Sequence, residues 1–212
     1  MKTKQAGFTL VEIAIVLVII GLLLGGVLKG QEMIVQAKVK NSITDFSGVS
    51  AAFYGYQDRY RAIPGDDIDA TRWGATVAKG NGDRVLTGLY VPAAVTDESA
   101  LWWDHLRRSG FITGGSGVTN PLNSFSGVLG VQTGDGAATP AAVLGGFTNL
   151  ILCSSNLPDK VAIALDVQMD DGQPGTGAVR GQLGSGSPAI AAAAAATYAE
   201  TGTNIYTLCR QF

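Results

Sequence analysis

The pattern of apolar and polar side chains marks out a long apolar stretch near the start of the chain. Residues 13–28 contain no charged or strongly polar side chain, and extending the run back to Phe8 gives 21 residues with one charge, Glu12. At about 1.5 Å per residue, a helix of this length spans about 31 Å, the thickness of a bilayer core. Residues 8–28 are therefore predicted to form a transmembrane helix.

Beyond Lys29 the apolar positions keep a helical period. They recur at steps of three or four residues, which places them on one helical face: Val35, Val39, Ile43, Phe46, Val49, Phe53, Tyr56 and Tyr60. The first break is at Pro64, because proline cannot continue a helical hydrogen-bond ladder. We expect one helix of about 55 residues from Phe8 to near Ala62, about 80 Å long. Its amphipathic half, residues 29–63, is predicted to pack on the chain's own domain.

The remainder, residues 64–212, reads as a globular domain rich in turns. It holds 22 of the 29 glycines, and such a composition is typical of sheets joined by long loops. Strands are expected at residues 126–131, 148–153, 161–169 and 204–209, and short helices through Trp73 and at residues 100–108. Residues 189–199, rich in alanine, fit either a short helix or a surface loop. The predicted fold class is α+β, with an antiparallel sheet packed against the long helix.

Composition and charge exclude several classes of protein. Lys and Arg total 15 against 17 Asp and Glu, which leaves no basic excess for binding nucleic acid. A single histidine, His105, excludes a multi-histidine metal centre, and we interpret it as a packed or surface residue rather than a catalytic one. No phosphate-binding loop pattern occurs. The sequence therefore predicts neither an enzyme nor a cofactor.

The first residues carry the most specific motif. A short basic leader, residues 1–7, ends in Gly7 and is followed by Phe8-Thr9-Leu10-Val11-Glu12. This motif resembles the processing site of type IV pilins and pseudopilins. The resemblance implies that a prepilin peptidase cleaves between Gly7 and Phe8 and methylates the new amine of Phe8. It covers residues 1–63 clearly and the rest of the chain only loosely.

A cleaved secretory signal peptide is the alternative interpretation of the N-terminus. Three features count against it: the apolar run is too long, no convincing cleavage site of small residues follows it, and the helical pattern continues without a break. The charges on the two sides of the apolar run are nearly balanced. The orientation with residues 64–212 outside the cytoplasm therefore rests on the resemblance and on the cysteines.

Glu12 is the one charge in the apolar stretch. The resemblance implies that it pairs with the cationic amine of Phe8 on a neighbouring subunit during assembly. In a dry helix bundle such a pair sets the register, because a shifted pair leaves a charge unpaired. The alternative is a carboxylate that reaches the lipid headgroups. Gly21, Gly25 and Gly26 suit either close helix approach or local melting of the helix, and both readings remain open.

The two cysteines, Cys153 and Cys209, lie near the C-terminal end of the sequence. In an oxidising compartment we expect a disulfide between them, which would stabilise the domain by about 4 kcal/mol in the chain-entropy model. Pilins likewise have a C-terminal region bounded by a disulfide, here residues 153–209. Two buried free thiols are the alternative.

Carboxylates in the turns raise the question of calcium, which prefers oxygen ligands. The candidates are weak, because no EF-hand loop pattern occurs: Asp66, Asp67, Asp170 and Asp171. Asp69 and Asp83 lie in similar turns. Solvated turn carboxylates are the preferred interpretation, so no metal is predicted.

The resulting hypothesis is a structural subunit of a type IV pilus-like filament. It would enter the bacterial inner membrane as a single-pass protein and later form a cell-surface pilus or a periplasmic pseudopilus. The implied partners are the prepilin peptidase, copies of itself or related pilins, and an inner-membrane assembly platform. The alternatives are a type II secretion pseudopilin and a membrane-anchored binding domain or enzyme that does not polymerise.

Overall fold

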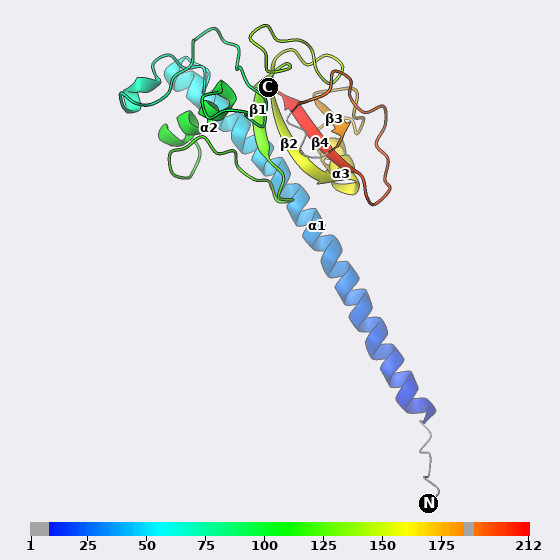
Figure 1. Cartoon of the computed structure of the whole chain (residues 1–212). Helices are drawn as coiled ribbons and strands as arrows, with labels where there is room; N and C mark the ends of the chain where they lie inside the picture. Colours follow the sequence, from blue (N-terminus) through cyan, green and yellow to red (C-terminus); the bar gives the residue numbers. More distant parts are fainter. Residues whose placement is uncertain (1–8, 185–188) are drawn as a thin grey trace, which may run out of the picture. The chain divides into compact units, whose positions relative to one another are not determined.

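The computed structural model of the chain describes residues 9–184 and 189–212 (Figure 1). The elements in chain order are α1 (Leu10–Tyr60), the 3-10 helix η1 (Ala70–Trp73), α2 (Glu98–Arg108), β1 (Leu129–Thr133), β2 (Leu150–Pro158), α3 (Asp159–Met169), β3 (Val179–Leu183) and β4 (Ile205–Gln211). The predicted α+β class is confirmed. Contacts divide the chain into two compact units, Met1–Lys38 and Val39–Phe212, and α1 contributes to both.

In the first unit, α1 is apolar and uncovered. No side chain in its most hydrophobic window of 18 residues is buried, and the mean hydropathy of that window is 2.8. Leu10 is 86% exposed and Leu22 is 73% exposed. By length and composition α1 is able to cross a membrane, and it is the one such helix among residues 9–184 and 189–212.

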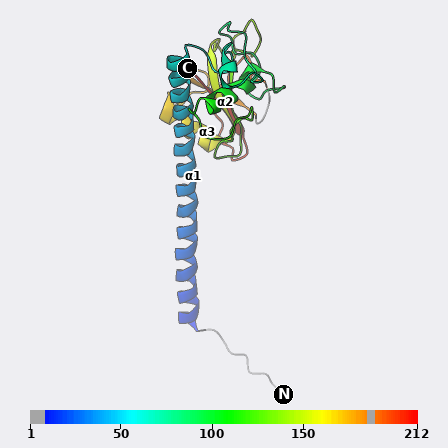
Figure 2. The same cartoon turned by 90° about the vertical axis from the view of Figure 1, so that its left-hand side faces the viewer.

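In the second unit, the part of α1 from Val39 onward supplies one wall of the core. Phe46, Val49, Phe53 and Tyr56 are buried, as the helical period predicts. Phe53 stacks on Trp102 of α2 with ring centroids 5.3 Å apart and an interplanar angle of 25°. Stacked aromatic pairs add stability beyond the area that they bury. α1 therefore packs beside both α2 and the sheet (Figure 2).

The sheet is antiparallel, with the strand order β1-β2-β4-β3. Because neighbouring side chains on a strand point to opposite faces, its two faces bury different partners. Leu152 and Leu208 pack in the clusters that include the helices, whereas Cys153 and Cys209 pack among loop residues. Both faces are thus covered, the first by helices and the second by loops.

A register shift between Ser154 and Leu157 interrupts the pairing of β2 with β4. Asn156, inside the shift, has a φ of 59°, a left-handed conformation that asparagine tolerates better than most residues. Bulges of this kind invert the alternation of a strand. As a result Leu157 joins Leu165 of α3 in the helix-side cluster.

The prediction of a strand at residues 161–169 is wrong, because this segment lies in α3. Its buried side chains include Val161, Ala162, Leu165 and Asp166, a helical spacing of one and four residues. Val167, which the alternating pattern placed inside, is 60% exposed. The small alanines between the larger residues allow the helix to pack.

The other expected elements agree in type, with shifted ends. β1 begins three residues later than the strand expected at 126–131, and β2 continues five residues beyond the strand expected at 148–153. β3 was not predicted. Residues 189–199 contain no helix, so the loop interpretation of this alanine-rich segment applies.

One glycine allows a loop to lie close against one face of β1. A Cβ atom at Gly130 would collide with the backbone oxygen of Tyr90 and crowd the amide nitrogen of Asn120. Asn120 holds this arrangement, because its amide donates hydrogen bonds to the carbonyls of Tyr90 and Leu129, at 2.8 and 2.9 Å. Gly130 thus lets the segment at Tyr90 lie directly against β1.

We predict that Gly130→Ala lowers the free energy of unfolding by about 1–3 kcal/mol, the usual cost of overpacking a tight site. Thermal unfolding of the full chain in detergent measures it. Gly115→Ala is the matched control, because an added Cβ there meets nothing within 4 Å. Equal melting temperatures for the two variants would contradict the close approach.

Candidate functional site

The N-terminal end of α1 is capped by a reciprocal pair of side chains. The backbone N–H and the hydroxyl of Thr9 both donate to Oε2 of Glu12, each at 2.8 Å. The backbone N–H of Glu12 in turn lies 3.3 Å from the hydroxyl of Thr9. This is the capping-box arrangement, which satisfies N–H groups that the first turn leaves without helical partners. The spacing Thr9-x-x-Glu12 already carries that signal in the sequence, although our prediction for Glu12 did not use it.

The second carboxylate oxygen of Glu12, Oε1, accepts no hydrogen bond from the described residues. Thr9 therefore holds the carboxylate at the start of the helix and leaves one oxygen available. Gly7 and Phe8 lie outside the described residues. Cleavage between them, methylation of Phe8 and the pairing of Glu12 with that amine stay predictions.

The glycines of the apolar stretch are not required by packing within the chain. A Cβ atom added at Gly21, Gly25 or Gly26 would meet nothing within 4 Å. All three lie inside a continuous helix, where glycine costs about 1 kcal/mol relative to alanine. Close helix approach and local melting of the helix therefore both stay open as interpretations of these glycines.

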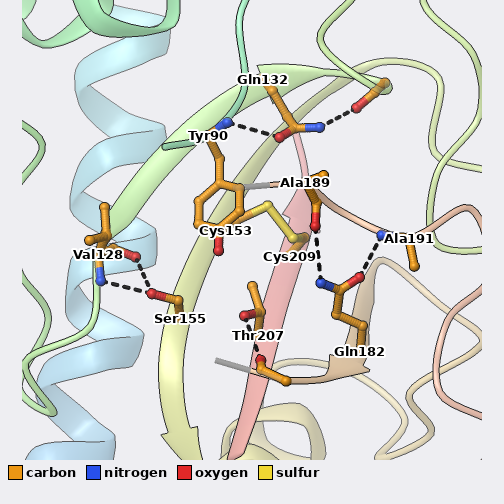
Figure 3. Close-up of a disulfide and its surroundings, with 12 residues drawn as sticks. Tyr90, Val128, Gln132, Cys153, Ser155, Gln182, Ala189, Ala191, Thr207 and Cys209 are labelled. Carbon is orange, nitrogen blue, oxygen red and sulfur yellow. Dashed lines mark hydrogen bonds between the residues drawn. A yellow bond between two sulfur atoms is a disulfide. The ribbon is translucent and has the colours of Figure 1, made fainter. Parts of the chain in front are cut away.

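The structure contains a disulfide between Cys153 and Cys209. The two residues are direct partners across β2 and β4, and neither is exposed. Tyr90 lies beside the bond on the loop-covered face of the sheet (Figure 3). The disulfide therefore ties together the two central strands of the sheet.

Two buried glutamines on the outer strands attach the covering loops. Gln132 of β1 accepts a hydrogen bond from the N–H of Tyr90, at 2.9 Å, and donates to the carbonyl of Gly134, at 2.5 Å. Gln182 of β3 accepts from the N–H of Ala191 at 2.6 Å. Figure 3 shows the two amides on either side of the disulfide. Our sequence analysis did not identify them, because no motif marks an isolated glutamine.

Asp66 and Asp67, two of the weak calcium candidates, are buried and bonded to the chain itself. Asp66 accepts the N–H groups of Gly82 and Arg84 at 2.6 and 2.7 Å, and burial raises the pKa of its carboxyl. Asp67 forms an ion pair with Arg72 at 2.6 Å. Burial opposes ionisation of Asp67, but hydrogen bonds from Tyr56 and Arg72 outweigh it and lower the pKa. Both side chains therefore fold the turn that follows α1.

Asp170 and Asp171, the other two candidates, lie close to Asp166 after α3. Carboxylate oxygens of these three residues lie within 4.8 Å of one another. Asp170 already accepts a hydrogen bond from the N–H of Val179. Asp171 accepts one from the hydroxyl of Thr176, and Asp166 accepts one from the hydroxyl of Tyr198. Asp66 and Asp67 are not part of this group of three carboxylates. We assign no metal ion to the group.

His105 is buried and its ring joins two segments to α2. Nδ1 accepts the N–H of Gly65, and Nε2 lies 2.9 Å from the carbonyl oxygen of Ala78. A neutral ring with its proton on Nε2 satisfies both contacts. Burial lowers the pKa of His105, and the charge of Arg108 lowers it further. The hydrogen bond to Ala78 and the carboxylates of Asp67 and Asp104 raise the pKa but do not outweigh burial. Its position makes it a structural residue.

We predict that the folded domain loses stability as the pH falls below 6.5, the ordinary pKa of histidine. Because the folded-state pKa is lowered, the unfolded chain binds more protons in this window, and stability therefore rises with pH through it. His105→Gln should be less stable near neutral pH and should show a flatter melting temperature down to about pH 5. Parallel pH profiles for the two proteins would contradict this assignment.

Comparison with known proteins identifies the N-terminal segment. Residues 2–28 match the family described as the prokaryotic N-terminal methylation motif. The match covers the leader, Glu12 and the apolar half of α1. Comparisons with curated proteins and with solved structures gave no match.

Proposed function

Because residues 2–28 carry the class III leader of type IV pilin-like proteins, we propose that this chain is a structural subunit of a type IV pilus-like filament. The motif implies processing by a prepilin peptidase and pilin-like assembly. Residues 1–7 are the leader, which is removed after Gly7, and Phe8 becomes the methylated N-terminus. The leader followed at once by an uncovered apolar helix is the observation that carries the proposal.

Residues 8–28 would form the filament core. Their exposed side chains need an apolar environment, which lipid supplies first and neighbouring helices supply after assembly. Gly21, Gly25 and Gly26 would let those helices approach closely, since nothing within the chain occupies the space beside them. The membrane then serves as a store of subunits whose helices the filament later covers.

Glu12 would guide each subunit into register. Thr9 occupies Oε2 of its carboxylate and leaves Oε1 available for a cationic amine. In an apolar bundle an unpaired carboxylate is costly, so the amine of Phe8 on a neighbouring subunit is its natural partner. Thr9 is thus a positioning residue for this pair.

Residues 64–212 would form the outer surface, with residues 29–63 connecting them to the core. Removal of Lys2 and Lys4 leaves 13 basic against 17 acidic side chains, a net charge of −4 for the mature chain. The buried disulfide of β2 and β4 suits a domain exposed to an oxidising compartment. A pilus on the cell surface is our first choice, with a periplasmic type II secretion pseudopilus as the second.

The N-terminal peptide of the native protein tests this proposal. We expect mass spectrometry of sheared surface material to find a peptide that begins at N-methylated Phe8. The same peptide confined to membranes would favour the pseudopilus. An unprocessed Met1 in both fractions would refute processing and leave a membrane-anchored domain that does not polymerise.

We predict that Glu12→Ala abolishes filament assembly while processing and membrane insertion survive. The change removes the charge that pairs with the neighbouring amine but leaves the apolar stretch intact. Sheared filament yield and the amount of processed protein in membranes measure the two effects. Assembly at the normal level would rule out the role given to Glu12.

We predict that Thr9→Val lowers filament yield several-fold, because it removes the hydroxyl that caps α1 and holds Glu12, a loss of about 0.5–2 kcal/mol. Thr9→Ser keeps the hydroxyl and should assemble almost normally. If the two variants assemble alike, the hydroxyl does not position Glu12.

A further inference from the structure

An apolar groove lies on the second unit beside the C-terminal half of α1. Its volume is about 370 Å³. α1 contributes Asp45 and Gly48 to its lining, and α2 contributes Trp103. The segments after α2 contribute Phe111, Ile112 and Pro121. Phe111, Ile112 and Pro121 are each half-buried, so their outer surfaces remain available. We call this feature the Asp45 groove.

Among the described residues that line the groove, Asp45 is the single charged one. Its side chain is half-buried, and it has no ion pair or hydrogen bond with any of the described residues. A carboxylate in such a place lacks most of its water and gains no compensating partner. The groove therefore has apolar walls and one carboxylate, that of Asp45, without a cationic partner among the described residues.

An exposed turn on the same unit, residues 79–84, has the complementary chemistry. Lys79 and Arg84 are exposed, and neither side chain forms an ion pair within the described residues. The turn's own carboxylate, Asp83, is engaged by the amide of Asn81 and the N–H of Val85, both at 2.8 Å. The turn thus presents two free cations.

Buried carboxylates hold this turn in place. Asp66 accepts the N–H groups of Gly82 and Arg84, and Glu98 accepts that of Asn81 at 3.1 Å. Asp66 is 3% and Glu98 is 7% exposed, so the support comes from inside the domain. An ordered turn loses little entropy when it docks.

We propose that the Asp45 groove of one subunit receives the 79–84 turn of a second copy, with Arg84 paired to Asp45. The aliphatic part of Arg84 lies along Phe111 and Pro121, since long cationic side chains cover apolar surface while their charge meets a partner. The groove and the turn are different surfaces of one chain. Their contact is heterologous and repeats from copy to copy as an open helical assembly. The inference rests on the proposed filament and names a contact between its subunits.

Exchange of the two charges tests the pair in the full chain. Asp45→Arg and Arg84→Asp should each lower sheared filament yield about tenfold, which corresponds to about 1.4 kcal/mol. The double variant Asp45→Arg/Arg84→Asp should recover most of that yield. Asp58→Arg is the matched control on α1, because the Asp58 side chain is 84% exposed and lies outside the groove. Protein level and an intact Cys153–Cys209 bond show that each variant folds.

Cysteine cross-linking tests the geometry independently. The pair Thr113→Cys and Lys79→Cys, at the groove and the turn, should give a ladder of dimers and longer products after mild oxidation of filaments. Thr113→Cys with Lys160→Cys is the control pair and should give no ladder. Normal filaments without a ladder, together with normal assembly of Asp45→Arg, would overturn the contact. An unaltered chain that forms no filaments would refute the proposed function itself, and this contact with it.

Discussion

The apolar half of α1 has no cover within its own unit, and the other features of the chain follow from that constraint. Each exposed leucine or isoleucine there costs up to about 3 kcal/mol in water. The segment is stable only in lipid or against other helices. The leader, the capped Glu12 and the three glycines all lie in or next to this uncovered stretch. Anchoring and assembly are thus two ways to meet one requirement.

The second unit meets its own requirement internally. Its sheet is covered on one face by helices and on the other by loops, which Gln132 and Gln182 attach. The N–H groups of Leu129 and Thr133 on the outer side of β1 bond to the carbonyls of Pro121 and Leu86, and the N–H of Ala195 bonds to the carbonyl of Gly181 beside β3. Covered edges do not pair with strands of other molecules. In the proposed filament, contacts between copies would therefore use side chains, such as those of the Asp45 groove.

Elements with a helical repeat over many residues can be predicted from the sequence, whereas elements determined by tertiary contacts cannot. The long helix, its buried face at Phe46 and Phe53, and the motif matched at residues 2–28 could all be predicted from the sequence. Residues 161–169 satisfied an alternating pattern and a helical one together, because alanine is neutral between them. β3 has a glycine and an arginine at its centre, and its pairing with β4 determines its structure.

The carboxylates of the turn after α1 show the same limit of prediction from the sequence. Asp66 and Asp67 follow Pro64-Gly65 in a segment that reads as a solvated turn, yet both are buried. Their donors come from residues up to 18 positions away, such as Arg84. No local sequence pattern predicts such a contact. The capping pair of Thr9 and Glu12 is only three residues apart, so the sequence contains the whole of its signal.

β4 lies between β2 and β3, so the two parts of the sheet meet only through Ile205–Gln211. During synthesis β1 and β2 can pair early, but β3 has no neighbour until this segment is made. The sheet closes last at its centre, and pairing between distant segments of this kind slows folding. The sheet can close and the Cys153–Cys209 bond can form only after β4 has been synthesised. A chain truncated before that point would keep the apolar helix without a finished domain, and such a product is a natural target for proteolysis.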